Sequence, residues 1–294
     1  PIFTDETNYI DWGYRATHAR GHLFYPLYDA KQPLIMWLFG LSQNFISDPL
    51  LASRLISVLF GLVTLVGLYK ISGPLAASLY TLVPIFVFFD RQALMETPLS
   101  AIGVWSAYFL LRFLEQPIYK YSLSLGTILG LGFLIKSNAL LFTFSALTLI
   151  AITAIRDSKN RLILINHTIL MITTAILINL PMLMQPIFWK NIHLTTQYSP
   201  TLSDVSQVPL SQWWKNTTGV LDISFWHLTP PIFLLSLWGM LKAPKHHRPL
   251  LAFTLLPLVA LIFSAKFIIS RYVAPFLPLT IIFTSISLAQ IKNS

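Results

Sequence analysis

Long apolar runs fill the chain from residue 49 to its C-terminal end, and they limit the fold more than any other feature of the sequence. A helix that crosses a membrane needs about 20 mostly apolar residues. A soluble domain is typically about 25% charged, whereas this 294-residue chain is 11% charged and 55% hydrophobic. Lipid must therefore solvate much of its surface. The sequence predicts an all-α, polytopic membrane protein.

Nine runs are candidates for membrane-spanning helices, although several are shorter than the usual range of about 17–25 residues. Glycine and proline inside them are compatible with membrane helices, because neighbouring groups re-satisfy the backbone. Gly126 and Gly130 lie four residues apart and predict close packing against a second helix. The candidate spans are 49–69, 73–89, 97–114, 121–135, 138–155, 162–180, 229–241, 250–265 and 272–289.

The charges between the spans predict the orientation in the membrane. With the first 47 residues outside, the short inner loops are basic, as the positive-inside rule requires. Of the 11 acids, only Glu115 and Asp157 fall inside. The other outer segments are then 90–96, 136–137, 181–228 and 266–271. The inner basic residues are Lys70, Arg112, Lys120, Arg156, Lys159, Arg161, Lys242, Lys245, Arg248 and Lys292.

Residues 1–47 concentrate charge and aromatic side chains, which predicts an outer loop that carries a reaction site. Within it, residues 33–46 are apolar but too short to span, so we expect a helix lying at the outer membrane boundary. Residues 181–228 predict a second long outer loop, with tryptophans suited to the membrane interface. The polar and aromatic residues of the first segment include Asp5, Glu6, Asp11, Arg15, Arg20, Asp29, Lys31, Tyr9, Trp12, Tyr14, Tyr25 and Tyr28.

Three carboxylates are candidate catalytic groups. Asp5 and Glu6 are adjacent, and such a pair can accept a proton, hold a divalent cation or simply be solvated. The scarcity of charge in this chain favours a functional role for them. Glu96 precedes Pro98 at the start of a predicted helix, where an acid stabilises the helix N-terminus. That structural role is compatible with a second catalytic carboxylate facing the first.

Four cations lie at the predicted outer ends of helices: Lys31, Arg54, Lys136 and Arg271. A lysine at such a position commonly extends its ammonium to lipid headgroups. If these side chains converge on one cavity, they would instead bind a phosphate group.

Other signals are weaker or exclude functions. His18 and His22 have a spacing that can ligate metal, but no accompanying motif, and a requirement for a divalent metal stays open. Asn216-Thr217-Thr218 is a glycosylation sequon.

The net charge of +9 is dispersed along the chain, which argues against nucleic-acid binding, and the absence of cysteine removes thiolate metal sites. No phosphate-binding loop or dinucleotide fingerprint is present, so a nucleotide-driven enzyme is not expected.

The order of several short motifs resembles the C-type membrane glycosyltransferases, in particular protein O-mannosyltransferases and bacterial transferases of aminoarabinose and of lipopolysaccharide-core sugars. The resemblance covers nearly the whole chain. The motifs are Asp5-Glu6, Lys31-Gln32-Pro33-Leu34 with Trp37, Ala52-Ser53-Arg54, Ala93-Leu94-Met95-Glu96-Thr97-Pro98, Gly130-Leu131-Gly132 to Lys136, and Arg271-Tyr272-Val273-Ala274-Pro275. The family usually has Lys-Pro where this chain has Lys31-Gln32-Pro33, and glycine and proline after the residue that matches Lys136.

The resemblance implies a single glycosyltransferase domain over residues 1–294, with residues 1–47 as the catalytic loop. It implies a polyprenyl-phosphate sugar as donor and a lipid, glycan or protein hydroxyl as acceptor. Asp5 would be the general base, supported by Glu6, with Glu96 as a second acidic group of the site. Lys31 would meet the donor phosphate, with Arg271, Tyr272, Arg54 and Lys136 assisting. The family's first membrane helix precedes the Asp-Glu motif, so we expect it to be missing here.

Two other classes of function stay open. A transporter or lipid flippase would also have many spans, but it usually carries charges and broken helices near the bilayer midplane. A non-catalytic membrane subunit would tolerate the loss of Asp5 and Glu96 together. The expected location is a bacterial plasma membrane, with the active site on the outer face and membrane lipids as neighbours.

Overall fold

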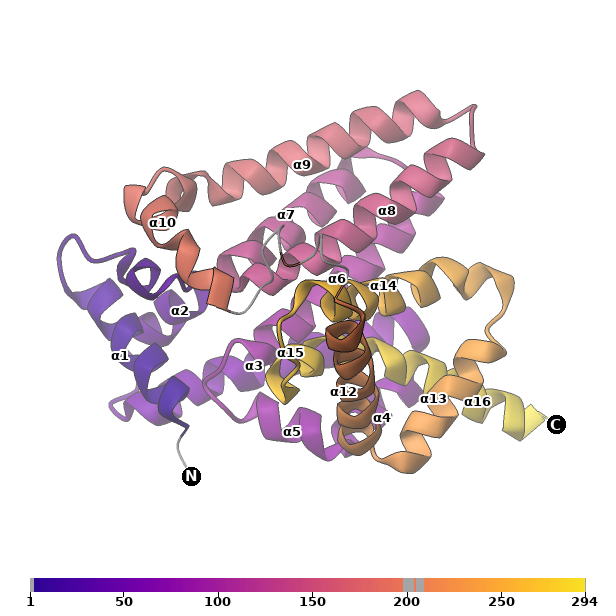
Figure 1. Cartoon of the computed structure of the whole chain (residues 1–294), viewed down its shortest axis with the longest axis horizontal. Coiled ribbons are helices and arrows are strands. Elements are labelled where there is room, and N and C mark those ends of the chain that lie inside the picture. The colour runs from indigo at the N-terminus through magenta and orange to yellow at the C-terminus, as the bar shows by residue number, and fades with distance from the viewer. Residues whose placement is uncertain (1–2, 198–203, 205–208, 294) are drawn as a thin grey trace.

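The computed structural model describes residues 3–197, 204 and 209–293, and within them every regular element is a helix (Figure 1). Six helical segments are long and apolar enough to cross a membrane, which confirms the predicted all-α, polytopic membrane fold. Four are α3 (Pro49–Ser72), α6 (Glu96–Glu115), Ser137–Arg156 with α8 (Leu140–Arg156), and α9 (Arg161–Leu183). The other two are Lys245–Ser264 with α14 (Arg248–Ser264), and Ser270–Ile291 with α15 (Ser270–Val273) and α16 (Thr280–Asn293).

The predicted count of nine spans is not confirmed, because three of the apolar runs form shorter helices. Run 73–89 is divided into α4 (Pro74–Leu82) and α5 (Pro84–Asp90), since proline disfavours helical geometry in the residue before it. Run 121–135 forms α7 (Tyr119–Ile135), whose 17 residues extend about 26 Å at 1.5 Å per residue. This is less than the bilayer core of about 30 Å.

The third short run, 229–241, forms α13 (Pro230–Leu241), which follows α12 (Leu210–Leu228) after a bend of 114°. Thr229 between them has a positive φ of 67° and Pro230 begins the next helix. If this bent pair is one broken span, the described residues contain seven spans at most.

The first 47 residues contain helices where a loop was predicted. They form α1 (Thr4–His18), the 3-10 turn η1 (Tyr25–Asp29) and α2 (Leu34–Ser42). The helix predicted within 33–46 is thus present as α2. Gly13 and Gly40 let α1 and α2 cross closely, because a Cβ atom on either would collide with backbone of the other helix. This packing gives the polar segment a rigid base.

The predicted loop 181–228 is also largely helical in its described part. Helix α9 continues through Pro181 to Leu183, and α10 (Pro186–Asn191), the 3-10 turn η3 (Ile192–Gln197) and α12 follow. In α12, Leu210, Trp214 and Leu221 recur with helical spacing and are all exposed. That pattern of apolar residues is the reason that the segment is a helix. Residues 198–203 and 205–208 of the predicted loop lie outside the described residues.

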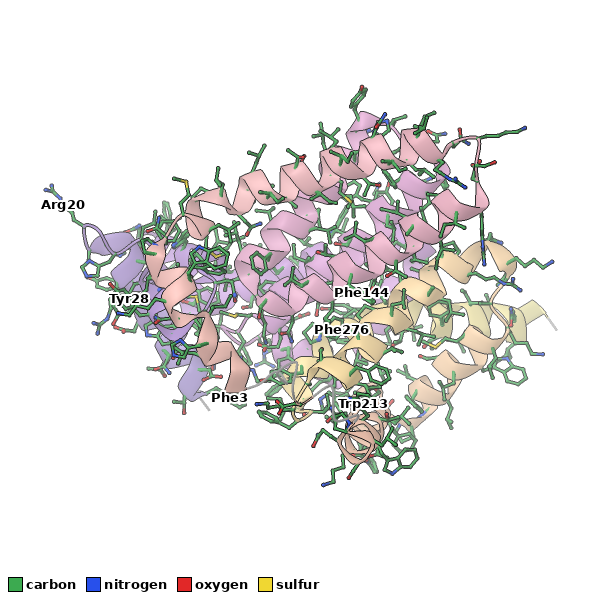
Figure 2. All side chains as sticks on the ribbon, turned by 45° about the horizontal axis from the view of Figure 1, so that its top comes forward. Phe3, Arg20, Tyr28, Phe144, Trp213 and Phe276 are labelled. Carbon is green, nitrogen blue, oxygen red and sulfur yellow. The ribbon has the colours of Figure 1, made fainter. Side chains whose placement is uncertain are left out.

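The core is built around the two most buried spans, α6 and Ser270–Ile291, of which 67% and 78% are buried. Phe142 of α8 and Phe276 of η5 (Ala274–Leu279) pack there with ring centroids 5.0 Å apart. Phe276 lies inside the bundle, whereas Phe144, 51% exposed, is on its surface (Figure 2). The exposed apolar side chains of the outer helices suit contact with lipid.

The predicted packing role of Gly126 and Gly130 is confirmed. A Cβ on Gly126 would collide with the Met171 carbonyl of α9, and one on Gly130 would crowd Ala175. The buried Asn179 of α9 also donates to the Gly130 carbonyl at 2.9 Å. Close backbone contact and an interhelical hydrogen bond therefore hold α7 against α9.

Candidate active site

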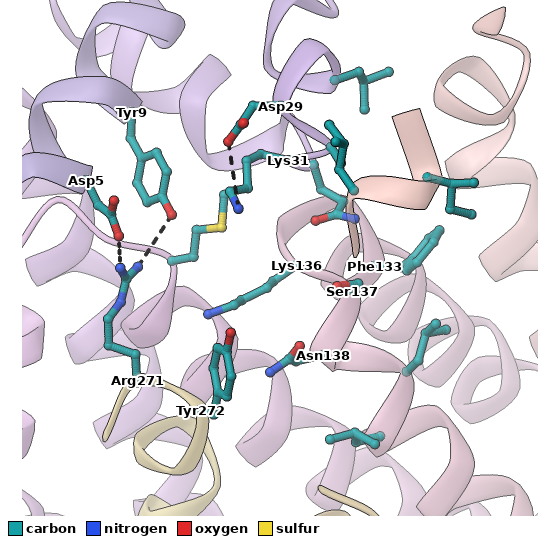
Figure 3. Close-up of a pocket in the computed structure, with 18 of the residues that line it drawn as sticks. Asp5, Tyr9, Asp29, Lys31, Phe133, Lys136, Ser137, Asn138, Arg271 and Tyr272 are labelled. Atoms are coloured by element: carbon teal, nitrogen blue, oxygen red, sulfur yellow. Dashed lines mark hydrogen bonds and ion pairs between the residues drawn. The ribbon is translucent and has the colours of Figure 1, made fainter. Parts of the chain in front are cut away.

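A cavity of about 680 Å³ lies at one end of the bundle, between the α1–η1 segment and the ends of several spans (Figure 3). Its polar residues come from distant parts of the chain. Its apolar wall comes from α7, α8, the α10–η3 segment and the end of α14. The polar lining includes Asp5, Asn8, Tyr9, Asp29, Lys31, Gln32, Lys136, Ser137, Asn138, Arg271 and Tyr272, and the apolar lining includes Leu27, Phe133, Leu140, Leu141, Phe188, Ile192, Leu194 and Leu261.

The alternation of the spans explains why these residues meet. Helix α7 ends at Ile135 just before Lys136, and the last span begins at Ser270 just before Arg271. Helix α6 begins at Glu96 at the same end of the bundle. Because successive helices run up and down, alternate helix ends lie at the same end of the bundle. The structure thus groups the turns at Glu96, Lys136 and Arg271 on one side, as predicted.

Glu96 is the centre of an ion network behind the cavity wall. Its side chain is 1% exposed. Its Oε1 accepts from Lys136 Nζ at 2.8 Å and from Arg271 Nε at 2.9 Å. Arg271 Nη2 lies 3.3 Å from Oε2. Glu96 is not among the lining residues, so it holds two cations at the cavity instead of facing a substrate.

Asp5 is the one of the three predicted catalytic carboxylates that lines the cavity. Its side chain is 44% exposed and pairs with the guanidinium of Arg271. Arg271 also donates to the Tyr9 hydroxyl at 3.4 Å. Asp5 and Tyr9 lie one turn apart on α1 and point toward Arg271 together (Figure 3).

Lys31 and Lys136 point into the middle of the cavity (Figure 3). The Lys31 side chain is 30% exposed, and its Nζ lies 3.8 Å from Asp29 Oδ2. Burial lowers the pKa of Lys31, an effect that Asp29 opposes and the nearby charge of Lys136 adds to. The Lys136 ammonium also lies 5.7 Å from the centroid of the Tyr272 ring. These ammonium groups, facing a half-enclosed cavity, can bind an anion.

Glu6 and Arg54, predicted as site residues, form a pair that does not line this cavity. Arg54 Nε and Nη2 donate to Oε1 and Oε2 of Glu6, both at 2.9 Å. The backbone N–H groups of Ala93 and Phe3 add bonds of 2.7 and 3.1 Å. Burial works to raise the pKa of Glu6, but these donors outweigh it and the pKa is lowered.

The Glu6–Arg54 pair joins three elements. It connects the first turn of α1 to α3 and to the turn that leads into α6. Asp5 is adjacent to Glu6 and Glu96 follows Ala93 by three residues, so these contacts fix Asp5 and Glu96 relative to each other. The structure thus places Asp5, Lys31, Lys136, Arg271 and Tyr272 on the cavity, and the other three predicted site residues behind it.

Sequence reasoning missed Tyr9, Asp29 and Asn138 as site residues. Tyr9 had a usable signal, because it follows Asp5 by four residues and Trp12 follows by seven, which puts all three on one helix face. Asp29 and Asn138 adjoin the predicted cations and had no signal of their own. Their place on the wall depends on tertiary structure.

The weaker sequence signals do not gather at this site. Among the described residues no group of three or more His, Asp or Glu is arranged to hold a metal ion. His18 bonds Asn44 at 2.9 Å, which joins the end of α1 to the turn that follows α2. Asn216 of the sequon is 1% exposed, and its amide donates to the carbonyls of Ile262 and Ala265. A glycan cannot be attached to this side chain in the folded protein.

Comparison with known proteins shows the family of this chain. The model of the dolichyl-phosphate-mannose-protein mannosyltransferase family matches residues 30–185, just over half of the chain. The chain belongs to this family. The resemblance inferred from the motifs is therefore confirmed. No curated protein matches by sequence.

Two solved structures share the fold of this mannosyltransferase family member. ArnT from Cupriavidus metallidurans in the apo state matches with a TM-score of 0.69, and the same protein bound to undecaprenyl phosphate matches with 0.62. Sequence identity is 14% in both cases. The matches cover 98% of this chain but 56% of the ArnT chain, so this chain spans a little over half the length of those structures.

Proposed function

We propose that the protein transfers a sugar from a polyprenyl-phosphate-linked donor to an acceptor hydroxyl. One observation carries the proposal. A single cavity is lined by the Asp5 carboxylate and by the side chains of Lys31, Lys136 and Arg271, which come from three distant parts of the chain. A base and a phosphate-binding group in one cavity are what this transfer requires. Family membership and the fold shared with an undecaprenyl-phosphate-bound ArnT support the assignment.

The reaction follows from these positions. Asp5 accepts the proton of the acceptor hydroxyl as its oxygen attacks the anomeric carbon of the sugar. The bond between that carbon and the phosphate oxygen breaks, and the phosphate leaves with the electron pair. Attack opposite the leaving group inverts the configuration. Lys31 and Lys136 stabilise the charge that grows on the phosphate, in a site where low dielectric strengthens the interaction.

Arg271 couples donor binding to the base. Its guanidinium is shared between Asp5 and Glu96. A donor phosphate gives this guanidinium another partner near Lys136. As Arg271 turns to the phosphate, the Asp5 carboxylate loses a competitor for the acceptor proton and becomes a better base. Glu96 keeps Arg271 and Lys136 at the site throughout.

The position of the polar groups favours an enzyme over a transporter. A transporter usually binds its substrate near the bilayer midplane. Here Asp5, Lys31 and Arg271 gather at one end of the spans, while the middle of the core is occupied by aromatic rings such as Phe142 and Phe276. The basic residues predicted in the inner loops support a position of this end on the outer face of the membrane, and we propose a bacterial plasma membrane as the location.

Replacing Asp5 with asparagine tests the proposal. We expect Asp5→Asn to lower sugar transfer in cells by about 10²–10⁴-fold, the usual contribution of a general base. The measurement is mass spectrometry of envelope lipids, glycans and proteins, which identifies the product lost when the gene is deleted. Asp11→Asn is a matched control on the same helix, because Asp11 pairs with Arg15 at 2.8 Å on an exposed surface. Unchanged product in a folded, membrane-inserted Asp5→Asn variant would overturn the assignment of the base.

A further inference from the structure

We infer that Asn191 is a positioning residue for Lys31, an inference that rests on the proposed function. Asn191 is the last residue of α10 and does not line the cavity. Its side-chain Nδ2 donates to the carbonyl of Leu27 at 3.1 Å and to that of Tyr28 at 2.9 Å. Both carbonyls belong to η1, more than 160 residues earlier in the chain. One amide thus holds the turn from which Lys31 extends.

The backbone of this turn has a conformation that is uncommon for a residue with a side chain. Ala30, between Asp29 and Lys31, has a φ of 52° in the left-handed region. A residue other than glycine seldom adopts this conformation, because its Cβ crowds the following carbonyl oxygen. Two internal bonds support it: Ala30 N–H donates to the Leu27 carbonyl and Lys31 N–H to the Pro26 carbonyl, both at 3.1 Å. Asn191 adds bonds from outside the turn.

An apolar cluster reinforces the same contact. Leu27 is 1% exposed and packs with Leu134 and Met182, and Ile187 and Phe188 of α10 cover this cluster. Burial of Leu27 and the two bonds of Asn191 therefore act together to keep α10 on η1. Since the bonds are directional, Asn191 fixes the orientation of the turn, which apolar packing alone does not.

The α10–η1 contact links the two walls of the cavity. Phe188 and Ile192, on either side of Asn191 in sequence, belong to the apolar wall. Lys31, at the end of the turn that Asn191 holds, belongs to the polar wall. An apolar chain lying on Phe188 and Ile192 would therefore rest on the element that sets the position of the phosphate-binding ammonium.

A double-mutant cycle tests this role, with the affinity of the full chain for undecaprenyl phosphate as the measurement. We expect Asn191→Ala to weaken binding about 5- to 150-fold, because two neutral hydrogen bonds contribute about 0.5–1.5 kcal/mol each and 1.4 kcal/mol is tenfold. In a Lys31→Ala background, Asn191→Ala should have no further effect. In a Lys136→Ala background it should keep its full effect.

Asn179→Ala is the matched control for a merely structural role. Asn179 also makes two bonds to carbonyls, at 2.9 Å to Gly130 and at 2.8 Å to Ala175, but it lies away from the cavity. We expect it to lower thermal stability without changing the affinity. Asn191→Asp, which has nearly the same shape but lacks the amide donor, should behave like Asn191→Ala.

The pH dependence of the affinity gives a second readout. Burial lowers the pKa of Lys31. In the Asn191→Ala variant, the Lys31 ammonium is no longer held in its buried position and should become more exposed to solvent. The pKa of Lys31 should then rise toward its ordinary value, so the loss of affinity at alkaline pH should move to higher pH. Two outcomes would overturn the role of Asn191 and leave the proposed function standing. One is unchanged affinity in Asn191→Ala, and the other is an equal loss of affinity on Asn191→Ala in chains with Lys31 and with Lys31→Ala. If the wild-type chain does not bind undecaprenyl phosphate, or binds it equally after Lys31→Ala, the proposed function fails as well.

Discussion

At the scale of single residues, the carboxylates of the site divide into two kinds by burial. Asp5 is 44% exposed on the cavity, whereas Glu6 is fully buried and Glu96 is 1% exposed. A buried charge is stable only when it is paired and hydrogen-bonded. Glu6 and Glu96 meet this condition through Arg54, Lys136 and Arg271, so their charges are used to fix neighbouring groups. Of these three predicted catalytic carboxylates, only Asp5 is exposed to the cavity.

The low pKa of Lys31 predicts a loss of donor affinity at alkaline pH. The ammonium form binds phosphate, so affinity should fall as pH rises through a pKa that burial holds below the ordinary value. Lys31→Arg should move this loss to higher pH, because arginine stays protonated. The measurement is the affinity for undecaprenyl phosphate from pH 7.5 to 10, a range in which the phosphate itself, with a second pKa of about 6, is already dianionic.

Protein stability should respond to Lys31 in the opposite direction. The folded state binds this proton less tightly than the unfolded state, whose lysine has the ordinary pKa. Stability therefore rises between the folded and the unfolded pKa, while affinity falls. If affinity and protein stability fell together as the pH rises, the assignment of this pH dependence to Lys31 would be contradicted.

At the scale of elements, small residues decide how closely the helices approach. In an exposed helix, Gly→Ala usually stabilises by about 1 kcal/mol, because alanine has the higher helix propensity. Gly126→Ala should instead destabilise by about 1–3 kcal/mol, since its Cβ would collide with the Met171 backbone of α9. The measurement is the thermal unfolding midpoint in detergent.

Gly219→Ala in α12 is the control for this prediction. A Cβ at Gly219 would lie 3.4 Å from the Cβ of Ile268, an ordinary contact. It should be neutral or stabilising. If both variants gave the same change, backbone propensity and not the approach of α7 to α9 would explain the role of Gly126.

Proline and polar residues decide where the apolar runs are interrupted. Pro84 divides run 73–89 between α4 and α5, and the Thr229–Pro230 junction separates α13 from α12. Hydropathy treats run 73–89 as continuous, because it does not register the missing amide of proline. The helices of runs 121–135 and 229–241 have 17 and 12 residues, too few to be counted as spans by themselves. These three runs are why the sequence predicted nine spans and the described residues contain six, or at most seven.

At the scale of the whole molecule, the proposed function requires that the cavity face the outside. The chain has no cysteine, so single cysteines can report the side of the membrane. Arg20 projects from the tip of the segment that follows α1 (Figure 2), and Lys159 is exposed in the α8–α9 connection at the opposite end of these spans. In intact cells, an impermeant maleimide should label Arg20→Cys and should label Lys159→Cys only after permeabilisation. The reverse pattern would place the active site inside and contradict the proposed orientation.

The sequence by itself determined the class of this protein and much of its site. Apolar runs too long and too numerous for a soluble core fixed the membrane fold, and motif order identified the family. Alternation of the spans also predicted that Asp5, Lys31, Lys136 and Arg271 lie on one side. Successive apolar helices run in opposite directions, so their order along the chain indicates the side on which each end lies. These inferences depend on properties that are local or periodic along the chain.

Only the tertiary structure decided which charged residue does what. Whether an acid faces a cavity or a partner depends on contacts between segments that are far apart in sequence, such as Glu6 with Arg54 and Glu96 with Arg271. The bonds of Asn191 to η1 are of the same kind. Burial and pairing set the charge and position of each group, and neither can be inferred from the residues adjacent to it in the sequence.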